Sequence, residues 1–323
     1  MVKVVVIMDR LDQTNKKKDT SLALMAEARR RFSQVAYACA DTVSLYRGDI
    51  IADVDWVIPS VDVNIEHKIL SSEPMQNLAD FDVVLLRKDP PFDLKYLYLT
   101  QLLEMLTFKN VKVINDPAAV RSANEKLFAL HFPQWCPETV VTSSVKEISR
   151  FRQFAGNIIL KPLDAMGGYG VLKVLQADQN LNVMVELLSN GGIVPIMAQK
   201  FIPEVTQGDK RILMIHGKAY PHGLLRVPAE GEFRGNLAAG GRGVGSELTR
   251  REQEMCEDIG PTLLKKGLCF VGLDVIGGFL TEINVTSPTC ARELDTLYAT
   301  SIPRLFWDGI ATDKIPIAID PCF

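Results

Sequence analysis

Two carboxylates and an amide stand in an apolar stretch near the carboxyl end of the chain. Asp274, Glu282 and Asn284 lie among Val, Ile and Leu residues, which predict two short strands around the turn Gly277-Gly278. Burying an unpaired carboxylate costs several kcal/mol or forces it to take up a proton. The pattern therefore predicts that something of opposite charge compensates these side chains.

The geometry of this hairpin decides whether the three polar side chains can meet. Glu282 and Asn284 are two residues apart, so on a strand they share a face. A two-residue turn would leave Glu282 facing away from Asp274, whereas a three-residue loop or a bulge would set the two opposite each other. Three oxygen ligands would then converge, and magnesium prefers such hard oxygen ligands. The alternative is that these side chains lie on a solvent-facing edge.

Two lysines and a glycine-rich segment have the pattern of a phosphate-binding site. Lys161 ends a predicted strand over 157–161, and Lys126 stands at a predicted helix start. The segment 164–170 (Asp-Ala-Met-Gly-Gly-Tyr-Gly) connects that strand to another over 171–175. Backbone N–H groups of such a loop can approach an anion while an ammonium group supplies charge. Taken alone, each lysine is more simply a solvated residue, and no Gly-Lys-Ser/Thr makes the segment a Walker loop.

Arginines form the third set of candidates. Arginine binds carboxylates and phosphates through two parallel hydrogen bonds, although a surface salt bridge is the more common role for any single arginine. The candidates are Arg87, Arg211, Arg226, Arg234, Arg242 and Arg292. Three of them fall in the glycine-rich stretch 226–245, which has too little apolar periodicity for a regular element. Long glycine-rich loops in compact domains are usually lids or binding loops.

The elements that position these residues fall into two groups. In the first group, predicted strands over 3–8, 81–86 and 111–114 alternate with helices over 20–31 and 94–106. This alternation predicts an open parallel sheet over about the first 120 residues. No Gly-x-Gly-x-x-Gly follows the first strand, which disfavours a dinucleotide site there.

The second group begins near residue 124 and is rich in strands. Strands are predicted over 194–201, 211–216 and 218–225, and a helix over 249–266 ends at Gly267 as its cap. With the lysines, the glycine loop and the carboxylates, this unit has the features of an ATP–magnesium site that is not a P-loop.

Composition narrows the class of protein further. The chain has 323 residues, a formal net charge of −3 and 47% hydrophobic residues, as an ordinary multidomain globular protein has. We expect no nucleic-acid partner, no membrane segment and no signal peptide. The six scattered cysteines and four histidines show no metal-ligand spacing, and we expect reduced thiols and a cytoplasmic location.

In seven segments the chain resembles the ATP-grasp superfamily and, within it, the bacterial glutathione synthetases. The segments are 86–93 (Leu-Arg-Lys-Asp-Pro-Pro-Phe-Asp), 124–128 (Asn-Glu-Lys-Leu-Phe), 160–164 (Leu-Lys-Pro-Leu-Asp), 208–211 (Gly-Asp-Lys-Arg), 234–243 (Arg-Gly-Asn-Leu-Ala-Ala-Gly-Gly-Arg-Gly), 270–274 (Phe-Val-Gly-Leu-Asp) and 280–290 (Leu-Thr-Glu-Ile-Asn-Val-Thr-Ser-Pro-Thr-Cys). Their order and spacing resemble the family over nearly the whole chain.

The resemblance implies an α/β (α+β) fold in three parts. Residues 1–122 would form a Rossmann-like domain, and 123–200 a first ATP-grasp subdomain with the phosphate-binding glycine loop. Residues 201–315 would form the second subdomain, with a lid loop over 226–243 and a metal hairpin over 271–285.

The resemblance also implies the activity. ATP would phosphorylate the carboxylate of γ-glutamylcysteine, and glycine would attack the acyl phosphate to give glutathione, ADP and phosphate. The implied cofactors are ATP and Mg2+, with Mn2+ possible, and the implied assembly is a homotetramer or dimer. The alternatives are another ATP-grasp carboxylate–amine ligase or a non-catalytic ATP-binding regulator.

Site roles follow from the resemblance position by position. The implied nucleotide-binding residues are Lys126, Lys161, Asp164, Gly167, Gly168, Gln199, Lys200, Phe201, Ile202 and Asp209. The implied metal ligands are Asp274, Glu282 and Asn284, and the implied catalytic residues are Arg211 and Arg226. The implied substrate-binding residues are Arg87, Arg234, Gly241, Ser287, Thr289 and Arg292. One departure is Ala165, where family members commonly have glycine, and alanine restricts positive φ at that position.

Overall fold

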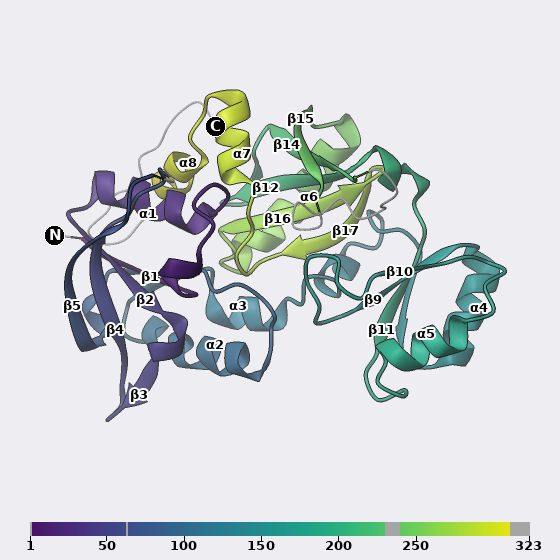
Figure 1. The fold of residues 1–323 in the computed structure, drawn as a ribbon, viewed down its shortest axis with the longest axis horizontal. Helices are drawn as coiled ribbons and strands as arrows, with labels where there is room; N and C mark the ends of the chain where they lie inside the picture. Colours follow the sequence, from purple (N-terminus) through teal and green to yellow (C-terminus); the bar gives the residue numbers. More distant parts are fainter. Residues whose placement is uncertain (1, 63, 230–239, 311–323) are drawn as a thin grey trace.

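The computed structural model contains three β-sheets with helices packed against them (Figure 1). The described residues are 2–62, 64–229 and 240–310. Short 3-10 helices connect some of the elements, at Leu11–Gln13, Ala40–Thr42, Leu78–Asp80, Phe128–His131 and Pro203–Gln207. Within these residues, none of the helices is both long enough and apolar enough to cross a bilayer.

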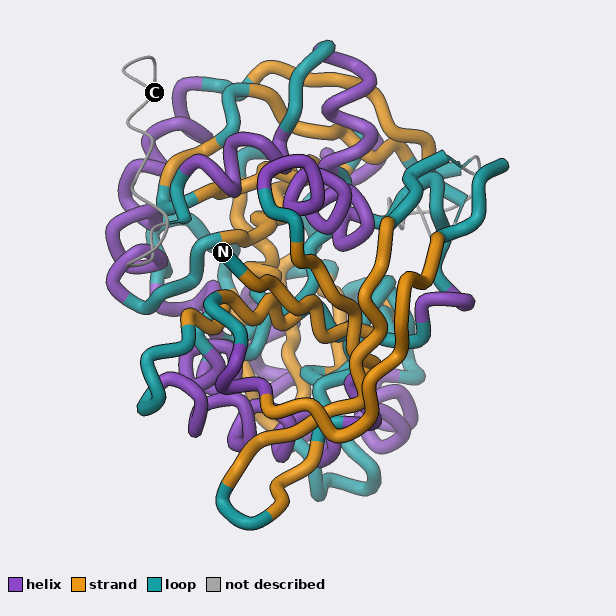
Figure 2. The backbone as a smooth tube through the Cα atoms, turned by 90° about the vertical axis from the view of Figure 1, so that its left-hand side faces the viewer, coloured by secondary structure: helices purple, strands orange, loops and turns teal. Residues whose placement is uncertain are grey.

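The first sheet has a parallel centre and an antiparallel margin. β1 (Lys3–Met8), β2 (Gln34–Cys39), β6 (Val83–Leu86) and β7 (Lys112–Ile114) pair in parallel. The antiparallel strands are β3 (Ser44–Tyr46), β4 (Asp49–Ile58) and β5 (Lys68–Asn77). Figure 2 looks onto the end of the molecule that carries β4 and β5, where long strands run down the face. The predicted parallel sheet is therefore right for the centre and incomplete at the margin.

Three helices belong to this first part of the chain, and an aspartate caps the amino-terminal end of each. The helices are α1 (Thr20–Arg31), α2 (Leu94–Thr107) and α3 (Pro117–Ser122). The side chains of Asp19, Asp93 and Asp116 accept hydrogen bonds from backbone N–H groups of their first turns. Such caps satisfy donors that a helix start otherwise leaves unpaired.

The second sheet is small, antiparallel and has a core of its own. Its order is β10 (Leu172–Val174), β9 (Ile158–Pro162), β11 (Ile196–Lys200) and β8 (Thr139–Thr142). Helices α4 (Val145–Ala155) and α5 (Leu181–Leu188) cover it, and Ile148, Leu160 and Val185 are among the buried residues between them. As predicted, β9 and β10 pair across the glycine-rich segment.

The third sheet carries the three predicted metal ligands and the two predicted catalytic arginines. Its strands are β12 (Asp209–Ile215), β13 (Lys218–Ala219), β14 (His222–Val227), β15 (Arg242–Glu247), β16 (Phe270–Ile276) and β17 (Phe279–Asn284). The helices that follow in the chain are α6 (Arg250–Lys265), α7 (Ala291–Tyr298) and α8 (Ile302–Asp308). The predicted lid loop 226–243 is not wholly a loop, because residues 226–227 belong to β14 and residues 242–243 to β15. Residues 230–239 lie outside the described residues.

The first and third sheets share a continuous hydrophobic core, although they lie far apart in sequence. One cluster of buried side chains joins Val5 and Ile7 of β1 to Ile212 of β12 and Val271 of β16. On the other side of β1, Trp307 of α8 donates its indole N–H to a backbone carbonyl of α1 at 2.9 Å. The third sheet is thereby fixed against the first.

Asn115, at the end of β7, bridges these two sheets with its side chain. Its amide nitrogen donates to Phe270 O at 2.9 Å and to Val285 O at 2.7 Å. Its oxygen accepts from the backbone N–H groups of Cys269 at 2.8 Å and Phe270 at 3.0 Å. Asn115 is 4% exposed, so removing the amide would leave several buried backbone groups without partners.

We expect Asn115→Ala to lower the free energy of unfolding by about 3–5 kcal/mol, because each unpaired buried polar group costs about 1–3 kcal/mol. Urea unfolding of the full chain measures this loss. The matched control is Asn157→Ala, which removes one exposed hydrogen bond to Gln176 N at 2.9 Å. A loss for Asn115→Ala no larger than for the control would contradict the bridging role.

Candidate functional site

The β16–β17 hairpin brings the two predicted carboxylates face to face. The turn at Gly277-Gly278 has two residues, with φ of +56° and +77°, and the register shifts between Asp274 and Val275. This bulge sets Asp274 opposite Glu282. Of the two predicted routes to a shared face, the bulge is confirmed and the three-residue loop is wrong. Asn284 pairs with Gly272, and each of these residues lies two positions from the Asp274–Glu282 pair on its own strand.

Asp274 is buried, and two arginines from neighbouring strands compensate its charge. Arg211 of β12 donates from Nε to Oδ1 at 2.5 Å and from Nη2 to Oδ2 at 3.0 Å. Arg226 of β14 brings Nη2 within 3.0 Å of Oδ2. Burial would raise the pKa of Asp274, but Arg211 and Arg226 outweigh burial and lower that pKa. The expectation that something of opposite charge accompanies this carboxylate is met by arginine side chains.

Asp209, at the start of β12, has one oxygen that is not satisfied. Its Oδ2 accepts a hydrogen bond from Arg226 Nη2 at 2.5 Å. Its Oδ1 is buried and has no hydrogen-bond partner among the described residues. Burial raises the pKa of Asp209 to about 6, although Arg226 opposes the shift. A buried acceptor without a donor is costly, so this atom suits a ligand hydroxyl.

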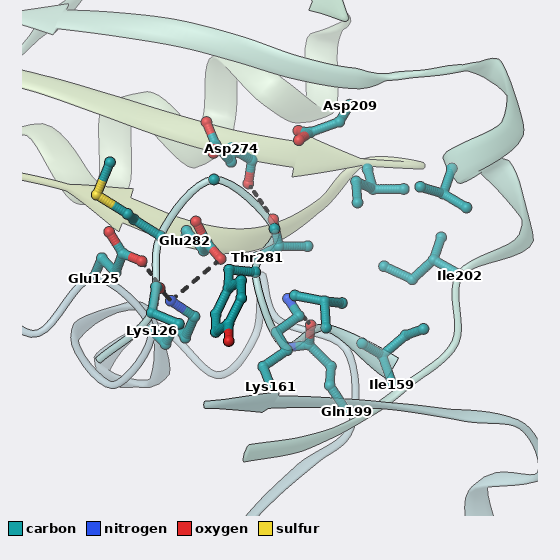
Figure 3. Close-up of a pocket in the computed structure, with 18 of the residues that line it drawn as sticks. Glu125, Lys126, Ile159, Lys161, Gln199, Ile202, Asp209, Asp274, Thr281 and Glu282 are labelled. Atoms are coloured by element: carbon teal, nitrogen blue, oxygen red, sulfur yellow. Dashed lines mark hydrogen bonds and ion pairs between the residues drawn. The ribbon is translucent and has the colours of Figure 1, made fainter. Parts of the chain in front are cut away.

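Lys126 reaches the hairpin from a turn that follows α3. The expected helix start at this position is wrong, because a turn separates α3 from the 3-10 helix at Phe128–His131. Lys126 Nζ donates to the Glu125 carboxylate and to Ala165 O at 2.8 Å, and it lies 3.8 Å from Glu282 Oε1. Burial disfavours its charge, but Glu282 and Glu125 outweigh burial and raise the pKa of Lys126. Figure 3 shows the three side chains converging on one side of the pocket.

Lys161 enters the same pocket from the small second sheet. It is 8% exposed, and its Nζ donates to Gln199 Oε1 on the neighbouring strand at 3.0 Å. Gln199 is fixed in turn, because its Nε2 donates to Thr139 Oγ1 at 3.1 Å. Burial lowers the pKa of Lys161. An ammonium group held by one neutral partner is suited to an anionic ligand.

These groups surround a cavity of about 800 Å³ between the second and third sheets, which we call the nucleotide cavity. The predicted nucleotide-binding residues that line it are Lys126, Lys161, Gly167, Gly168, Gln199, Lys200, Phe201, Ile202 and Asp209, and Asp274 and Glu282 also line it. Asp164 is the exception, because it lines a different cavity of about 540 Å³ beside the first.

A third cavity, of about 870 Å³, adjoins the nucleotide cavity, and we call it the peptide cavity. The predicted residues in its wall are Arg211, Arg226, Asn284, Ser287 and Thr289, with Asp274 and Glu282 again present. The two carboxylates of the hairpin therefore stand in a wall that both cavities share. A group transferred from one cavity to the other would pass them.

The other described residues that were predicted to bind the substrate do not line the nucleotide or peptide cavity. Arg87 is 5% exposed and donates from Nε to Ser21 Oγ at 3.0 Å and from Nη2 to Pro288 O at 2.9 Å. Burial lowers the pKa of Arg87. Arg292 donates to Val61 O at 3.0 Å. Gly241 directly precedes β15, and Arg234 lies outside the described residues.

Glu125 and Met166 were missed, although both line all three cavities. Glu125 directly precedes Lys126, and the sequence predicted a phosphate-binding role in this segment for the lysine only. Its backbone carbonyl accepts from Ile283 N at 2.8 Å, which holds it against β17. Burial and the neighbouring Glu282 raise the pKa of Glu125 to about 7. No pattern in the sequence reveals a carboxylate placed in this way by a tertiary contact.

The hairpin fits a divalent cation that phosphate oxygens help to coordinate. Within residues 2–62, 64–229 and 240–310, no three or more His, Cys, Asp and Glu side chains form a complete metal site. Glu282 has only the 3.8 Å contact with Lys126 among the described residues. Asp274 and Asn284 share its face, and magnesium commonly takes few protein ligands with phosphate and water as the rest.

Comparison with known proteins agrees with this geometry. Family models match residues 2–121 ("Prokaryotic glutathione synthetase, N-terminal domain") and 125–299 ("Prokaryotic glutathione synthetase, ATP-grasp domain"). The glutathione synthetase of Vibrio parahaemolyticus is 44% identical over 310 residues, covering 96% of this chain and 98% of that protein. That of Escherichia coli is 43% identical over 311 residues, covering 96% and 98%.

The fold agrees as well. A Chryseobacterium gregarium RiPP-associated ATP-grasp ligase has a TM-score of 0.65 at 17% identity, with 98% of each chain covered. ATP-grasp ligases of this family use ATP and a divalent metal. The chain therefore belongs to the prokaryotic glutathione synthetase family of ATP-dependent ATP-grasp ligases.

Proposed function

We propose that this chain ligates γ-glutamylcysteine to glycine with ATP, giving glutathione, ADP and phosphate. The observation that carries the proposal is the shared wall formed by Asp274 and Glu282 between the nucleotide and peptide cavities. That arrangement suits transfer of a phosphoryl group from a nucleotide on one side to a carboxylate on the other. Family membership supports the identity of the substrates.

The nucleotide cavity offers a partner for each part of ATP. Gln199, Lys200, Phe201 and Ile202 lie in its wall and would hold the adenine, mostly through backbone groups. The unsatisfied Oδ1 of Asp209 would accept a hydrogen bond from a ribose hydroxyl. Lys126 and Lys161 would hold the phosphates, with the backbone of Gly167 and Gly168 beside them.

Asp274, Glu282 and Asn284 would hold Mg2+, with Mn2+ as a possible substitute. When bound, the ion neutralises charge on the phosphate oxygens and orients them. The chain's own contribution is a hairpin whose bulge sets the two carboxylates side by side. Among the described residues, the Glu282 carboxylate forms an ion pair with Lys126 only, at 3.8 Å. A metal ion would compete with Arg211 and Arg226 for the Asp274 carboxylate.

Arg211 and Arg226 would act on the peptide side. Both guanidinium groups line the peptide cavity and are held in place by Asp274. They would neutralise the phosphoryl group as it reaches the cysteinyl carboxylate, and then the oxyanion formed when the glycine nitrogen attacks the acyl phosphate. The C–N bond forms as the carbon–oxygen bond to phosphate breaks, so phosphate leaves with its electron pair.

The remaining assignments extend this proposal. Acyl phosphates hydrolyse, so the segment that connects β14 to β15 would act as the lid that excludes water. Ser287 and Thr289 would contact the peptide substrate, and Arg87 would position Pro288 beside it. Arg292, Arg234 and Gly241 would also bind the peptide substrate. We also propose the three-part division 1–122, 123–200 and 201–315, a homotetramer or dimer, and a cytoplasmic location.

The decisive experiment measures phosphate release from ATP–Mg with γ-glutamylcysteine and glycine, omitting each substrate in turn. We expect release to require both substrates and glutathione to form in equal amount. Release that depends on neither substrate would sink the proposal. ATP binding without turnover would favour a regulator, and turnover with a different amine would favour another ligase of this superfamily.

Glu282→Gln should lower turnover by about 100-fold or more, because it removes a charged ligand at the point of phosphoryl transfer. Folding should persist, since among the described residues the Glu282 carboxylate makes one ion pair, at 3.8 Å, and no side-chain hydrogen bond. Turnover at increasing magnesium, together with a thermal melt, measures both effects. The control is Glu186→Gln on the exposed face of α5, which should match the parent protein. Near-normal turnover in Glu282→Gln would show the metal assignment to be wrong.

Lys161→Met should lower kcat/KM for ATP by about 100-fold while leaving the ligand-free protein at least as stable at pH 7. The reason is that burial lowers the pKa of Lys161 from its usual 10.5, so folding opposes its charge. The folded state then binds fewer protons than the unfolded state, and the parent protein gains stability relative to the variant as the pH rises from 7 towards 10.5.

Urea unfolding at several pH values, with ATP titrations beside it, tests this expectation. Lys146→Met is the control, because Lys146 is exposed on α4 and does not line the nucleotide cavity. A stability difference that does not change with pH would rule out the buried charge as its cause.

A further inference from the structure

Lys126 stands between two carboxylates, and only one of them holds it by a hydrogen bond (Figure 3). Its Nζ donates to Oε1 of Glu125, the residue directly before it. The other carboxylate oxygen, Glu282 Oε1, lies 3.8 Å from the same nitrogen, which is beyond hydrogen-bond distance. Because Glu282 is a proposed metal ligand, the position of the Lys126 ammonium group affects whether Glu282 is free to bind a cation.

The chain fixes this ammonium group from two sides. Glu125 is held through its backbone, because its carbonyl accepts from Ile283 N of β17 at 2.8 Å. Lys126 Nζ also donates to Ala165 O, in the glycine-rich segment, at 2.8 Å. The side chain of Lys126 is 3% exposed and that of Glu125 is 18% exposed, so water replaces these partners poorly. The Glu125 carboxylate is therefore the charged group that sets the direction of the lysine.

The loss of this partner would turn Lys126 towards the metal site. Without the Glu125 carboxylate, Glu282 is the remaining carboxylate within ion-pair distance of Lys126 among the described residues. A movement of Nζ by about 1 Å would bring it to hydrogen-bond distance from Glu282 Oε1. Hydrogen bonds between two charged groups are stronger than neutral ones. Such a bond would occupy an oxygen that a metal ion needs, and the ammonium group and the ion would repel each other.

We propose that Glu125 is a positioning residue for the metal site: by holding Lys126 Nζ, it keeps that ammonium group off Glu282 and leaves the Glu282 carboxylate free for the divalent cation. This inference rests on the proposed metal site and on the proposed role of Lys126 at the phosphates. In this scheme Glu125 acts through Lys126 and touches neither the cation nor a reacting atom.

The effect of Mg2+ on nucleotide binding tests the proposal without turnover. The measured quantity is the ratio of two dissociation constants of AMPPNP, a non-hydrolysable ATP analogue, obtained by calorimetry of the full chain in EDTA and in excess Mg2+. At pH 8 Glu125 is ionised, since burial and Glu282 raise its pKa to about 7. In Glu125→Gln we expect the ratio to fall about 10-fold, because Lys126 then competes with the cation for Glu282.

Steady-state phosphate release supplies a second readout. In Glu125→Gln we expect the Mg2+ concentration that gives half-maximal turnover to rise about 10-fold, with most of the lost kcat recovered in excess Mg2+. A purely structural defect would instead lower kcat by the same factor at every Mg2+ concentration, and that result would contradict the proposal.

Lys126→Met is the matched background. Because Glu125 is proposed to act through Lys126, adding Glu125→Gln to Lys126→Met should leave the AMPPNP ratio unchanged. If a thermal melt shows that Glu125→Gln does not fold, Glu125→Ala takes its place in both backgrounds, since it also removes the carboxylate that holds Lys126.

Two binding results would overturn the proposal and leave the metal site and the ligase function intact. One is an AMPPNP ratio in Glu125→Gln equal to that of the parent protein. The other is a fall of the same size in the Lys126→Met background, which would mean that Glu125 acts on the cation directly. A parent protein whose AMPPNP affinity does not respond to Mg2+ would overturn this inference together with the metal site on which it rests.

Discussion

The buried charge of Asp274 is the constraint on which the rest of the site depends. A carboxylate in the middle of a sheet is tolerable only when partners of opposite charge surround it, and Arg211 and Arg226 supply them from β12 and β14. These ion pairs therefore require one register of β12, β14 and β16. The bulge that turns Glu282 towards Asp274 then places a second negative charge in the site, and among the described residues its ion pair is with Lys126.

Much of this could be predicted because it depends on local sequence. Two short apolar stretches around a glycine turn identified β16 and β17, and the two-residue spacing of Glu282 and Asn284 put them on one face. Lys161 was identifiable because it ends an apolar strand before a glycine loop. The hairpin geometry could be narrowed only to two possibilities, since both a longer turn and a bulge give the same facing side chains.

What could not be predicted depends on contacts between distant parts of the chain. β3, β4 and β5 were not identified; β5 is exposed along most of its length, so its sequence has little of the apolar pattern on which strand prediction relies. Lys126 was placed on a helix start, but Asn124 and β17 hold that segment as a turn. Glu125 enters the site through the same tertiary contact, which no spacing along the chain encodes.

The small second sheet has consequences for how the molecule unfolds. It supplies Lys161 and Gln199 to the nucleotide cavity, yet its hydrophobic core is separate from the cores that join the other two sheets. Two bodies with separate cores unfold with limited cooperativity unless something bridges them. Under the proposed function, a nucleotide held by Lys161 on one side and Asp209 on the other would be such a bridge. Ligand binding at this cavity would then couple the two parts into one cooperative unit, which would link substrate occupancy to the stability of the whole chain.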